Sequence, residues 1–210
     1  MKAGRKRSFD KEEALDTAMR VFWENGYNGT SLSDLTSALG INKPSLYAAF
    51  GNKEQLFATA MDHYIECYAA PNLHQLTDAP DAPLSQRLRA YLFGVIDVIS
   101  DCESPKGCMF VKSSCESGGT AIPDQIQASI QGMGMANEAA LAKLLEAAKQ
   151  NGQLAEDAQV QNITSYLLSV IYGLSILARR GKPRKELETV ADMAVHSLPC
   201  KNGQKDTRPG

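Results

Sequence analysis

Residues 30–57 read TSLSDLTSALGINKPSLYAAFGNKEQLF and contain three helix starts separated by two tight breaks. Each start carries a polar residue whose side chain can cap the free amides of a first helical turn, namely Ser31, Asn42 and Asn52. Gly40 supplies the residue that best tolerates a left-handed helix end. Two short helices joined by a tight turn, the second with exposed donors near its start, form the arrangement that places side chains in the DNA major groove. An ordinary helical hairpin is the alternative, because short helix pairs are common and the stretch has no catalytic motif.

The order of residues in this stretch resembles the DNA-binding signature of the TetR family. The likeness rests on Thr30-Ser31, Ala38-Leu39-Gly40-Ile41, Ser45-Leu46-Tyr47 followed by Phe50, and Asn52-Lys53-Glu54 followed by Leu56-Phe57. It covers roughly the first sixty residues of the chain. The resemblance implies an all-helical, dimeric, ligand-responsive transcriptional regulator, usually a repressor, that binds double-stranded DNA. It says little about the inducer, because the ligand half of such proteins is variable.

The candidate DNA contacts come partly from side-chain chemistry and partly from this resemblance. Hydroxyls and free amides at a helix start suit a phosphate, lysine can donate to guanine, and proline can touch a thymine methyl group. The resemblance places Tyr47 and Lys53 on the phosphate backbone at either side, and Leu46 and Phe50 are expected to be structural. The basic start of the chain is expected to be a mobile arm on the DNA, with a solvated tail as the alternative. The predicted contacts are Arg5, Lys6, Arg7, Thr30, Ser31, Lys43, Pro44, Ser45, Tyr47 and Lys53.

Length and composition favour a folded, cytoplasmic protein. The chain has 210 residues and a formal net charge of −2, and 43% of its residues are hydrophobic, which is enough for a sizeable core. No apolar run approaches the roughly eighteen residues of a membrane span, and polar residues follow the basic start, so neither a membrane partner nor a secretory segment is expected. The five cysteines suggest no disulfide framework, because the set is odd and the chain is not short and secreted.

Hydrophobic periodicity predicts an all-α fold with two domains. We expect the arm and the helix-turn-helix domain in residues 1–52, a helical ligand-binding and dimerisation domain in residues 53–200, and a disordered tail in residues 201–210. A connector helix is expected from Lys53 to Pro71, followed by a proline-containing loop over residues 72–83.

The last two predicted helices suit a homodimer. Residues 161–180 are apolar over more than one face, and such a helix must be buried on two sides. Together with a final helix after Pro183, they fit a four-helix interface between two copies on a two-fold axis. A symmetric dimer in turn fits a palindromic operator with half-sites a helical turn or so apart.

An unknown small-molecule inducer would bind among the helices of the second domain. Aromatic and methionine side chains there are either ligand contacts or ordinary core residues. The candidates are Tyr64, Tyr68, Tyr91, Phe110, Met133 and Tyr172.

Cys108 is a candidate redox sensor. A helix start and the neighbouring Lys106 would both lower the pKa of its thiol. The competing interpretation is a small buried apolar residue. The spacing of Cys102, Cys108 and Cys115 is wrong for zinc, and His63 stands alone on the connector, so we expect no metal and no cofactor.

Two other classes of function were weighed against a DNA-binding regulator. An enzyme has no support in a glycine-rich phosphate loop, metal-ligand spacing or nucleophile elbow. A helical scaffold would use the helix-turn-helix for protein contacts. Salt dependence separates the scaffold from DNA binding, which weakens steeply as salt rises.

Overall fold

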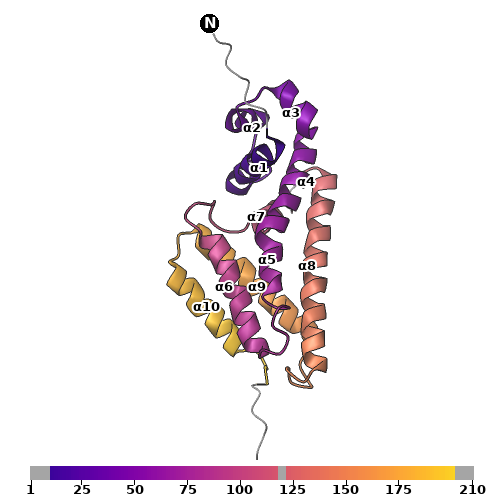
Figure 1. The fold of residues 1–210 in the computed structure, drawn as a ribbon, viewed down its shortest axis with the longest axis vertical. Coiled ribbons are helices and arrows are strands. Elements are labelled where there is room, and N and C mark those ends of the chain that lie inside the picture. Colours follow the sequence, from indigo (N-terminus) through magenta and orange to yellow (C-terminus); the bar gives the residue numbers. More distant parts are fainter. Residues whose placement is uncertain (1–9, 118–121, 202–210) are drawn as a thin grey trace, which may run out of the picture.

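The fold is all-α, as predicted. The computed structural model describes residues 10–117 and 122–201. The helices are α1 (Lys11–Asn25), α2 (Leu32–Leu39), α3 (Lys43–Phe50), α4 (Lys53–Tyr64), the π-helix η1 (Ile65–Ala69), α5 (Ala70–His74), α6 (Leu84–Ser100), α7 (Met109–Glu116), α8 (Asp124–Gln150), α9 (Val160–Arg179) and α10 (Arg184–His196). Figure 1 shows α1, α2 and α3 as a small group at one end, which we call the head, and α4 running from it into the larger group, the body.

The predicted caps of the short helices are confirmed. At the start of α2, Ser31 Oγ accepts the Asp34 amide at 3.1 Å and the Asp34 carboxylate accepts the Ser31 amide at 2.8 Å. At the start of α4, Asn52 and Gln55 exchange the same pair of bonds at 2.8 and 3.0 Å, and α3 has its asparagine cap. Gly40 ends α2 in the left-handed conformation, with a φ of 64°. These local bonds define three short helices that hydrophobic burial alone would leave marginal.

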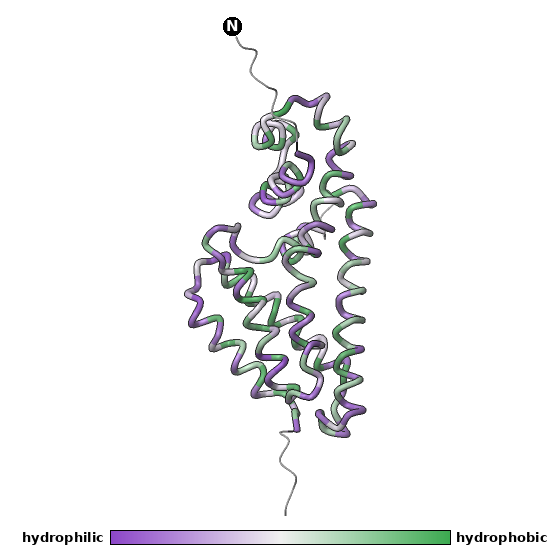
Figure 2. The backbone as a smooth tube through the Cα atoms, viewed as in Figure 1, coloured by the Kyte–Doolittle hydropathy of each residue, from purple (hydrophilic) through white to green (hydrophobic). Residues whose placement is uncertain are grey.

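Two hydrophobic cores hold the molecule together. The core of the head reaches beyond residue 52, because α4 contributes five buried side chains to it: Leu56, Phe57, Ala60, Met61 and Tyr64. The core of the body is built mainly from α6, α8, α9 and α10. Figure 2 shows hydrophobic and hydrophilic residues alternating along the helices, as amphipathic packing requires. The head core also includes Met109 of α7 and Ile126 and Ile130 of α8, so α4 packs against both groups and a change in its tilt would move the head.

The predicted end of the connector at Pro71 is wrong. Helical structure continues from α4 through η1 and α5 to His74, so the irregular segment is shorter than predicted and spans residues 75–83. Proline lacks an amide donor and crowds the preceding turn of an α-helix. Here the wider π turn comes first, with the Ala70 amide bonded to the Ile65 carbonyl, and Pro71 then occupies the first turn of α5. Proline is tolerated there because first-turn amides need no intrahelical partner.

The long apolar helix α9 is a core helix of the body. It has 20 residues and a mean hydropathy of 1.3, enough by length and composition to cross a membrane. It packs against α6, α8 and α10, and Leu167 and Leu174 on it are fully buried. A buried core helix meets the same criteria of length and composition, so this property carries no argument for a membrane.

The described chain ends in contact with the body. The Lys201 amide donates to the Gln153 carbonyl at 2.9 Å, and Cys200 forms an isolated β-bridge with Leu154. The predicted tail is therefore wrong at its first residue, since Lys201 is held by a backbone hydrogen bond. The rest of the predicted tail, residues 202–210, lies outside the described residues.

Candidate nucleic-acid interface and ligand cavity

The helix α3 presents one polar face to solvent. Lys43, Pro44 and Ser45 in its first turn are exposed, and the Tyr47 side chain is 46% exposed. Leu46, between them, is fully buried and anchors the helix in the head core. This alternation follows from the helical period of 3.6 residues, and it leaves a cation, a hydroxyl and a phenol pointing away from the protein. The predicted outward direction of Lys43, Ser45 and Tyr47 is confirmed.

Thr30 does not have the predicted role, because its side chain points into the protein. It is 1% exposed, and its hydroxyl donates to the Gly26 carbonyl at 2.6 Å. The carbonyls at the end of a helix lack intrahelical partners, and the Thr30 hydroxyl satisfies the one that follows α1. Ser31, in contrast, is exposed at the start of α2, where a hydroxyl and free amides can meet a phosphate.

Lys53 lies half-buried at the start of α4, against the ring of Tyr27. Its ammonium is 4.1 Å from the ring centroid, and burial lowers the pKa of this lysine. The Tyr27 hydroxyl donates to the Glu54 carboxylate at 2.9 Å, which fixes the ring below the ammonium. The aromatic ring holds the Lys53 ammonium in one position, so little freedom would be lost when it binds a phosphate. The contact between Lys53 and a phosphate stays a prediction. The other predicted basic contacts, Arg5, Lys6 and Arg7, lie outside the described residues.

A cavity in the body brings together all six predicted ligand residues. Its volume is about 340 Å³, and Tyr64, Tyr68, Tyr91, Phe110, Met133 and Tyr172 all line it. These side chains come from α4, η1, α6, α7, α8 and α9, so helices from the whole body meet at this point. No acidic or basic side chain of the described residues lines the cavity. Burial raises the pKa of Tyr91 to about 12, and it also raises the pKa of Tyr172, so both phenols are neutral at physiological pH.

Two amide side chains in the cavity were missed by the sequence analysis. Asn72 lies on α5, in a segment predicted to be a loop, and Asn137 lies near the middle of α8. A single asparagine on a helix gives no pattern that would distinguish it from a solvated residue. Only the arrangement of the helices shows that both residues line the cavity. The Asn72 side-chain nitrogen donates to the Tyr68 carbonyl at 3.0 Å, so Asn137 is the better placed of the two to orient a ligand through hydrogen bonds.

The predicted activation of Cys108 is wrong. Burial raises the pKa of its thiol, and this effect exceeds the opposing hydrogen bonds from Tyr64 and from the first amides of α7. The Tyr64 hydroxyl donates to Cys108 Sγ at 3.2 Å. Lys106 points elsewhere, since its ammonium donates to the carbonyls of Ser100 and Asp101 at 2.7 and 2.8 Å. Cys108 is thus a protonated thiol in the cavity wall, close to the interpretation as a small apolar residue.

This burial predicts an order of reaction with an alkylating agent. We expect iodoacetamide at about pH 7.5 to modify the exposed Cys102 and Cys115 well before Cys108, because only the thiolate reacts. Burial disfavours the charged form of Cys108, so its rate of modification should keep rising as the pH passes the ordinary thiol pKa of 9.0. Mass spectrometry of peptides at successive times measures the order. Modification of Cys108 first at neutral pH would contradict this assignment.

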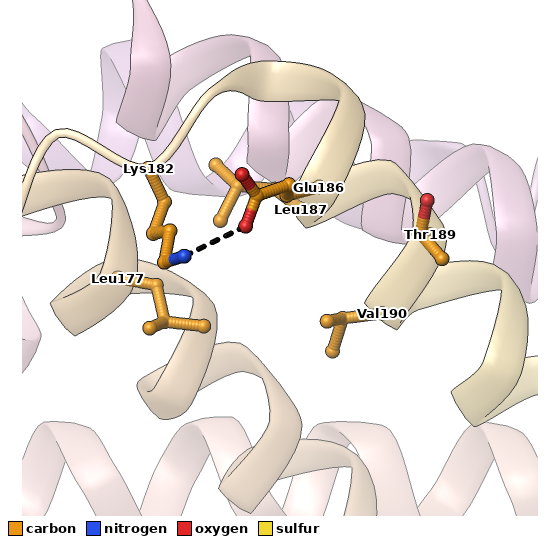
Figure 3. A pocket seen from close by; sticks show the side chains of 6 residues that line it. All are labelled: Leu177, Lys182, Glu186, Leu187, Thr189 and Val190. Carbon is orange, nitrogen blue, oxygen red and sulfur yellow. Dashed lines mark hydrogen bonds and ion pairs between the residues drawn. The ribbon is translucent and has the colours of Figure 1, made fainter.

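An exposed apolar face on α9 and α10 matches the predicted dimer interface. Ile176 on α9 and Met193 on α10 are 47% and 67% exposed, and Tyr166 and Val190 extend the same pair of helices. Figure 3 shows the shallow pocket between the two helices, where Lys182 and Glu186 form an ion pair at 2.8 Å. Large apolar side chains exposed on two adjacent helices are typical of an interface between subunits.

Known proteins resemble this chain over almost its whole length. Residues 14–60 match the family model described as bacterial regulatory proteins, tetR family, and residues 85–193 match the tetracyclin repressor-like C-terminal domain. The chain is 32% identical to the HTH-type transcriptional repressor ComR of Escherichia coli (strain K12), over 93% of this chain and 92% of that protein. It is 30% identical to the HTH-type transcriptional repressor BdcR of the same strain, over 93% and 92%.

A solved structure has a similar fold. It is a cysteine mutant of the TetR family transcriptional regulator CifR complexed with a 26-base-pair operator DNA. The likeness has a TM-score of 0.85 at 31% identity and covers 93% of this chain and 100% of that one. The chain therefore belongs to the TetR family of bacterial regulatory proteins, and it is a DNA-binding transcriptional regulator.

Proposed function

We propose that two copies of this chain bind one palindromic operator as a repressor and release it when a small neutral molecule enters the cavity. The observation that carries the proposal is the outward face of α3, where Lys43, Ser45 and Tyr47 are exposed around the buried Leu46. Lysine and serine can donate to base edges, and tyrosine can donate to a phosphate. The likeness to a CifR mutant complexed with operator DNA covers 93% of this chain, which supports DNA binding by this fold.

The dimer follows from the exposed face of α9 and α10. Pairing that face with its own copy around a two-fold axis would bury Ile176 and Met193 and form a bundle of four helices. Two heads related by such an axis would meet a palindrome with the same symmetry. The exposed face therefore supports both the dimer and the symmetry of the operator.

The chemistry of the cavity defines the class of inducer. A charged ligand would lose its hydration without gaining an ionic partner there, which is strongly unfavourable. A neutral molecule with an apolar body and one or two polar groups would instead meet the tyrosine hydroxyls and the amide of Asn137. Release by modification of Cys108 has less support, because its thiol stays protonated at neutral pH.

Selection of duplexes from a random DNA library, with the purified full-length chain, tests the proposal. We expect a palindromic consensus, and an affinity that falls steeply with salt. A protein with six to ten phosphate contacts loses roughly 10³-fold or more between about 50 and 200 mM salt. A panel of small neutral and small charged compounds is then added to the complex, and only neutral ones should release the DNA. Failure to enrich any duplex, or binding that ignores salt, would contradict the proposal and favour a protein scaffold.

A further inference from the structure

The first helix of the head rests directly on two walls of the cavity. The Trp23 ring on α1 packs edge-on against Tyr64 and Tyr68, with centroid distances of 4.8 and 5.1 Å. Those two tyrosines stack on each other at 5.5 Å. Trp23 is fully buried, and its indole N–H donates to the Gly107 carbonyl at 2.8 Å, which ties α1 to the loop before α7. The same aromatic rings thus face the cavity on one side and the head on the other.

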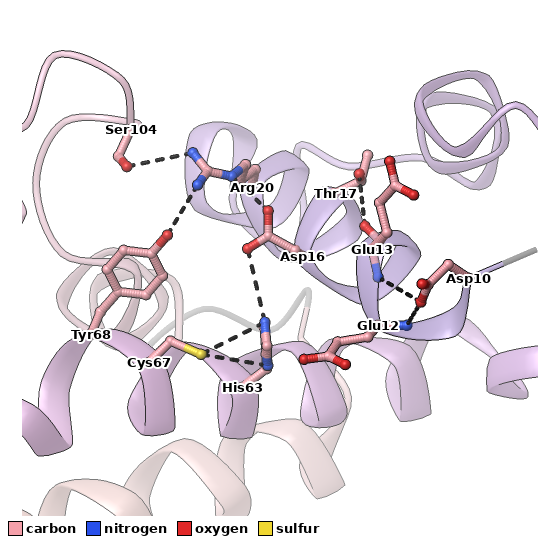
Figure 4. Close-up of polar contacts among 10 residues, drawn as sticks. All are labelled: Asp10, Glu12, Glu13, Asp16, Thr17, Arg20, His63, Cys67, Tyr68 and Ser104. Atoms are coloured by element: carbon pink, nitrogen blue, oxygen red, sulfur yellow. Dashed lines mark hydrogen bonds and ion pairs between the residues drawn. The ribbon is translucent and has the colours of Figure 1, made fainter.

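Arg20, one helical turn earlier, joins the head to the cavity by hydrogen bonds. Figure 4 shows its guanidinium between Asp16 on its own helix and Tyr68 on η1. Arg20 Nη2 donates to the Tyr68 hydroxyl at 3.0 Å, and Nε donates to the Asp16 carboxylate at 2.8 Å. Its third nitrogen donates to the Glu103 carbonyl at 3.1 Å and to Ser104 Oγ at 3.4 Å. Because all three nitrogens donate hydrogen bonds, the guanidinium has a fixed position from which it donates to the Tyr68 hydroxyl.

We propose that the hydrogen bond between Arg20 and Tyr68 is the contact through which the cavity sets the position of the head. This inference rests on the proposed function, because it assigns a route from the cavity to the DNA. Tyr68 lines the cavity with its ring and reaches α1 with its hydroxyl. A ligand that displaces the ring must also move the hydroxyl away from Arg20. Tyr68 therefore joins the cavity directly to α1, the first helix of the head.

The path from α1 to the DNA-binding helix is short. The helix α1 packs against α2 and α4, and α2 packs against α3. Packed helices of this kind shift as units, because close-packed side chains transmit displacement instead of absorbing it. Loss of the Arg20 contact would therefore allow the whole head to tilt. Neither residue needs to touch DNA for its loss to weaken operator binding.

Tyr68→Phe tests the inference, because it removes only the hydroxyl and keeps the ring that lines the cavity. Its matched control is Thr77→Val, which also removes one hydrogen-bonded hydroxyl; that hydroxyl donates to the His74 carbonyl at 3.2 Å, in the segment after α5 and outside the cavity lining. We expect Tyr68→Phe to weaken binding to the selected operator duplex about tenfold, the effect of losing one charge-assisted hydrogen bond that the proposal assigns to the DNA-binding arrangement. Thr77→Val should stay within about twofold of the unchanged protein.

A double-mutant cycle makes the test specific to the pair. Arg20→Gln should weaken operator binding at least as much, because Arg20 also bonds Asp16, Glu103 and Ser104, and adding Tyr68→Phe to it should cost little more, because the shared bond is already lost. Thermal melting and the dimer fraction show whether each variant is folded. Equal affinities for Tyr68→Phe and Thr77→Val, or additive losses in the cycle, would overturn the inference. Failure of the unchanged protein to bind any selected duplex would instead refute the proposed function.

Discussion

Replacing Lys43 and Tyr47 together with alanine is expected to weaken operator binding by about 100-fold or more. Each side chain projects from α3, and a contact to a base or phosphate contributes roughly 1–3 kcal/mol. Both are exposed, so their removal should change the free energy of unfolding by less than about 0.5 kcal/mol each. Titration of the selected duplex measures the affinity, and thermal melting measures the stability.

A single variant and a control separate the loss of a contact from α3 from the general effect of removing a positive charge. Lys43→Ala alone should reduce the slope of log affinity against log salt by about one if the lysine meets a phosphate, and should relax sequence preference if it meets a base. The control is Lys143→Ala, which removes the same charge from an exposed position on α8, in the body. An equal loss of affinity in the control and the double variant would show that α3 does not contact the operator.

Replacing Ile176 and Met193 together with aspartate is expected to convert the dimer into a folded monomer. In a single chain both positions are largely exposed, so the new carboxylates remain hydrated. In the dimer they would be buried without a partner, at a cost of several kcal/mol for each charge. We expect the dimer dissociation constant to rise by roughly 10³-fold or more, as measured by analytical ultracentrifugation. Operator affinity should fall by about 100-fold, because the second head is no longer tethered to the first.

Met135 provides the matched control for this interface. It is 72% exposed on α8, outside the pair of helices assigned to the dimer. Met135→Asp makes the same chemical change at a comparable exposure, so the dimer should survive it. If Met135→Asp dissociated the dimer and the pair of substitutions did not, the interface would lie on α8 and the assignment to α9 and α10 would be wrong.

The features predicted correctly from the sequence are mainly those that depend on residues close together in the chain. The caps at Ser31 and Asn52 need only a side-chain oxygen near an amide three residues away, and both are present as predicted. The exposed face of α3 follows in the same way from helical periodicity. The six cavity residues were predicted by residue type on helices expected to pack together. Their meeting in one cavity confirms that packing, while binding of a ligand there stays a prediction.

The incorrect predictions concern properties that depend on neighbours distant in sequence. The hydroxyl of Thr30 could serve either a phosphate or a backbone carbonyl, and only the fold shows that it bonds Gly26. The thiol of Cys108 has two features in the sequence that would activate it, but burial by surrounding helices raises its pKa, in line with the competing interpretation as a small buried residue. The bond between Arg20 and Tyr68 joins residues 48 positions apart and has no signature in the sequence. The π turn before Pro71 likewise depends on the packing of the connector.

Under the proposed function, the absence of ionic groups among the described residues that line the cavity would determine what kind of information the regulator receives. Most intermediates of central metabolism carry phosphate, carboxylate or ammonium groups, and such molecules would be rejected for lack of a counter-charge. Uncharged lipophilic compounds would be admitted, and these are the compounds that diffuse through a lipid bilayer without a transporter. A protein with this selectivity would respond to the chemical composition of the surroundings of the cell and ignore fluctuations in its own nutrient pools.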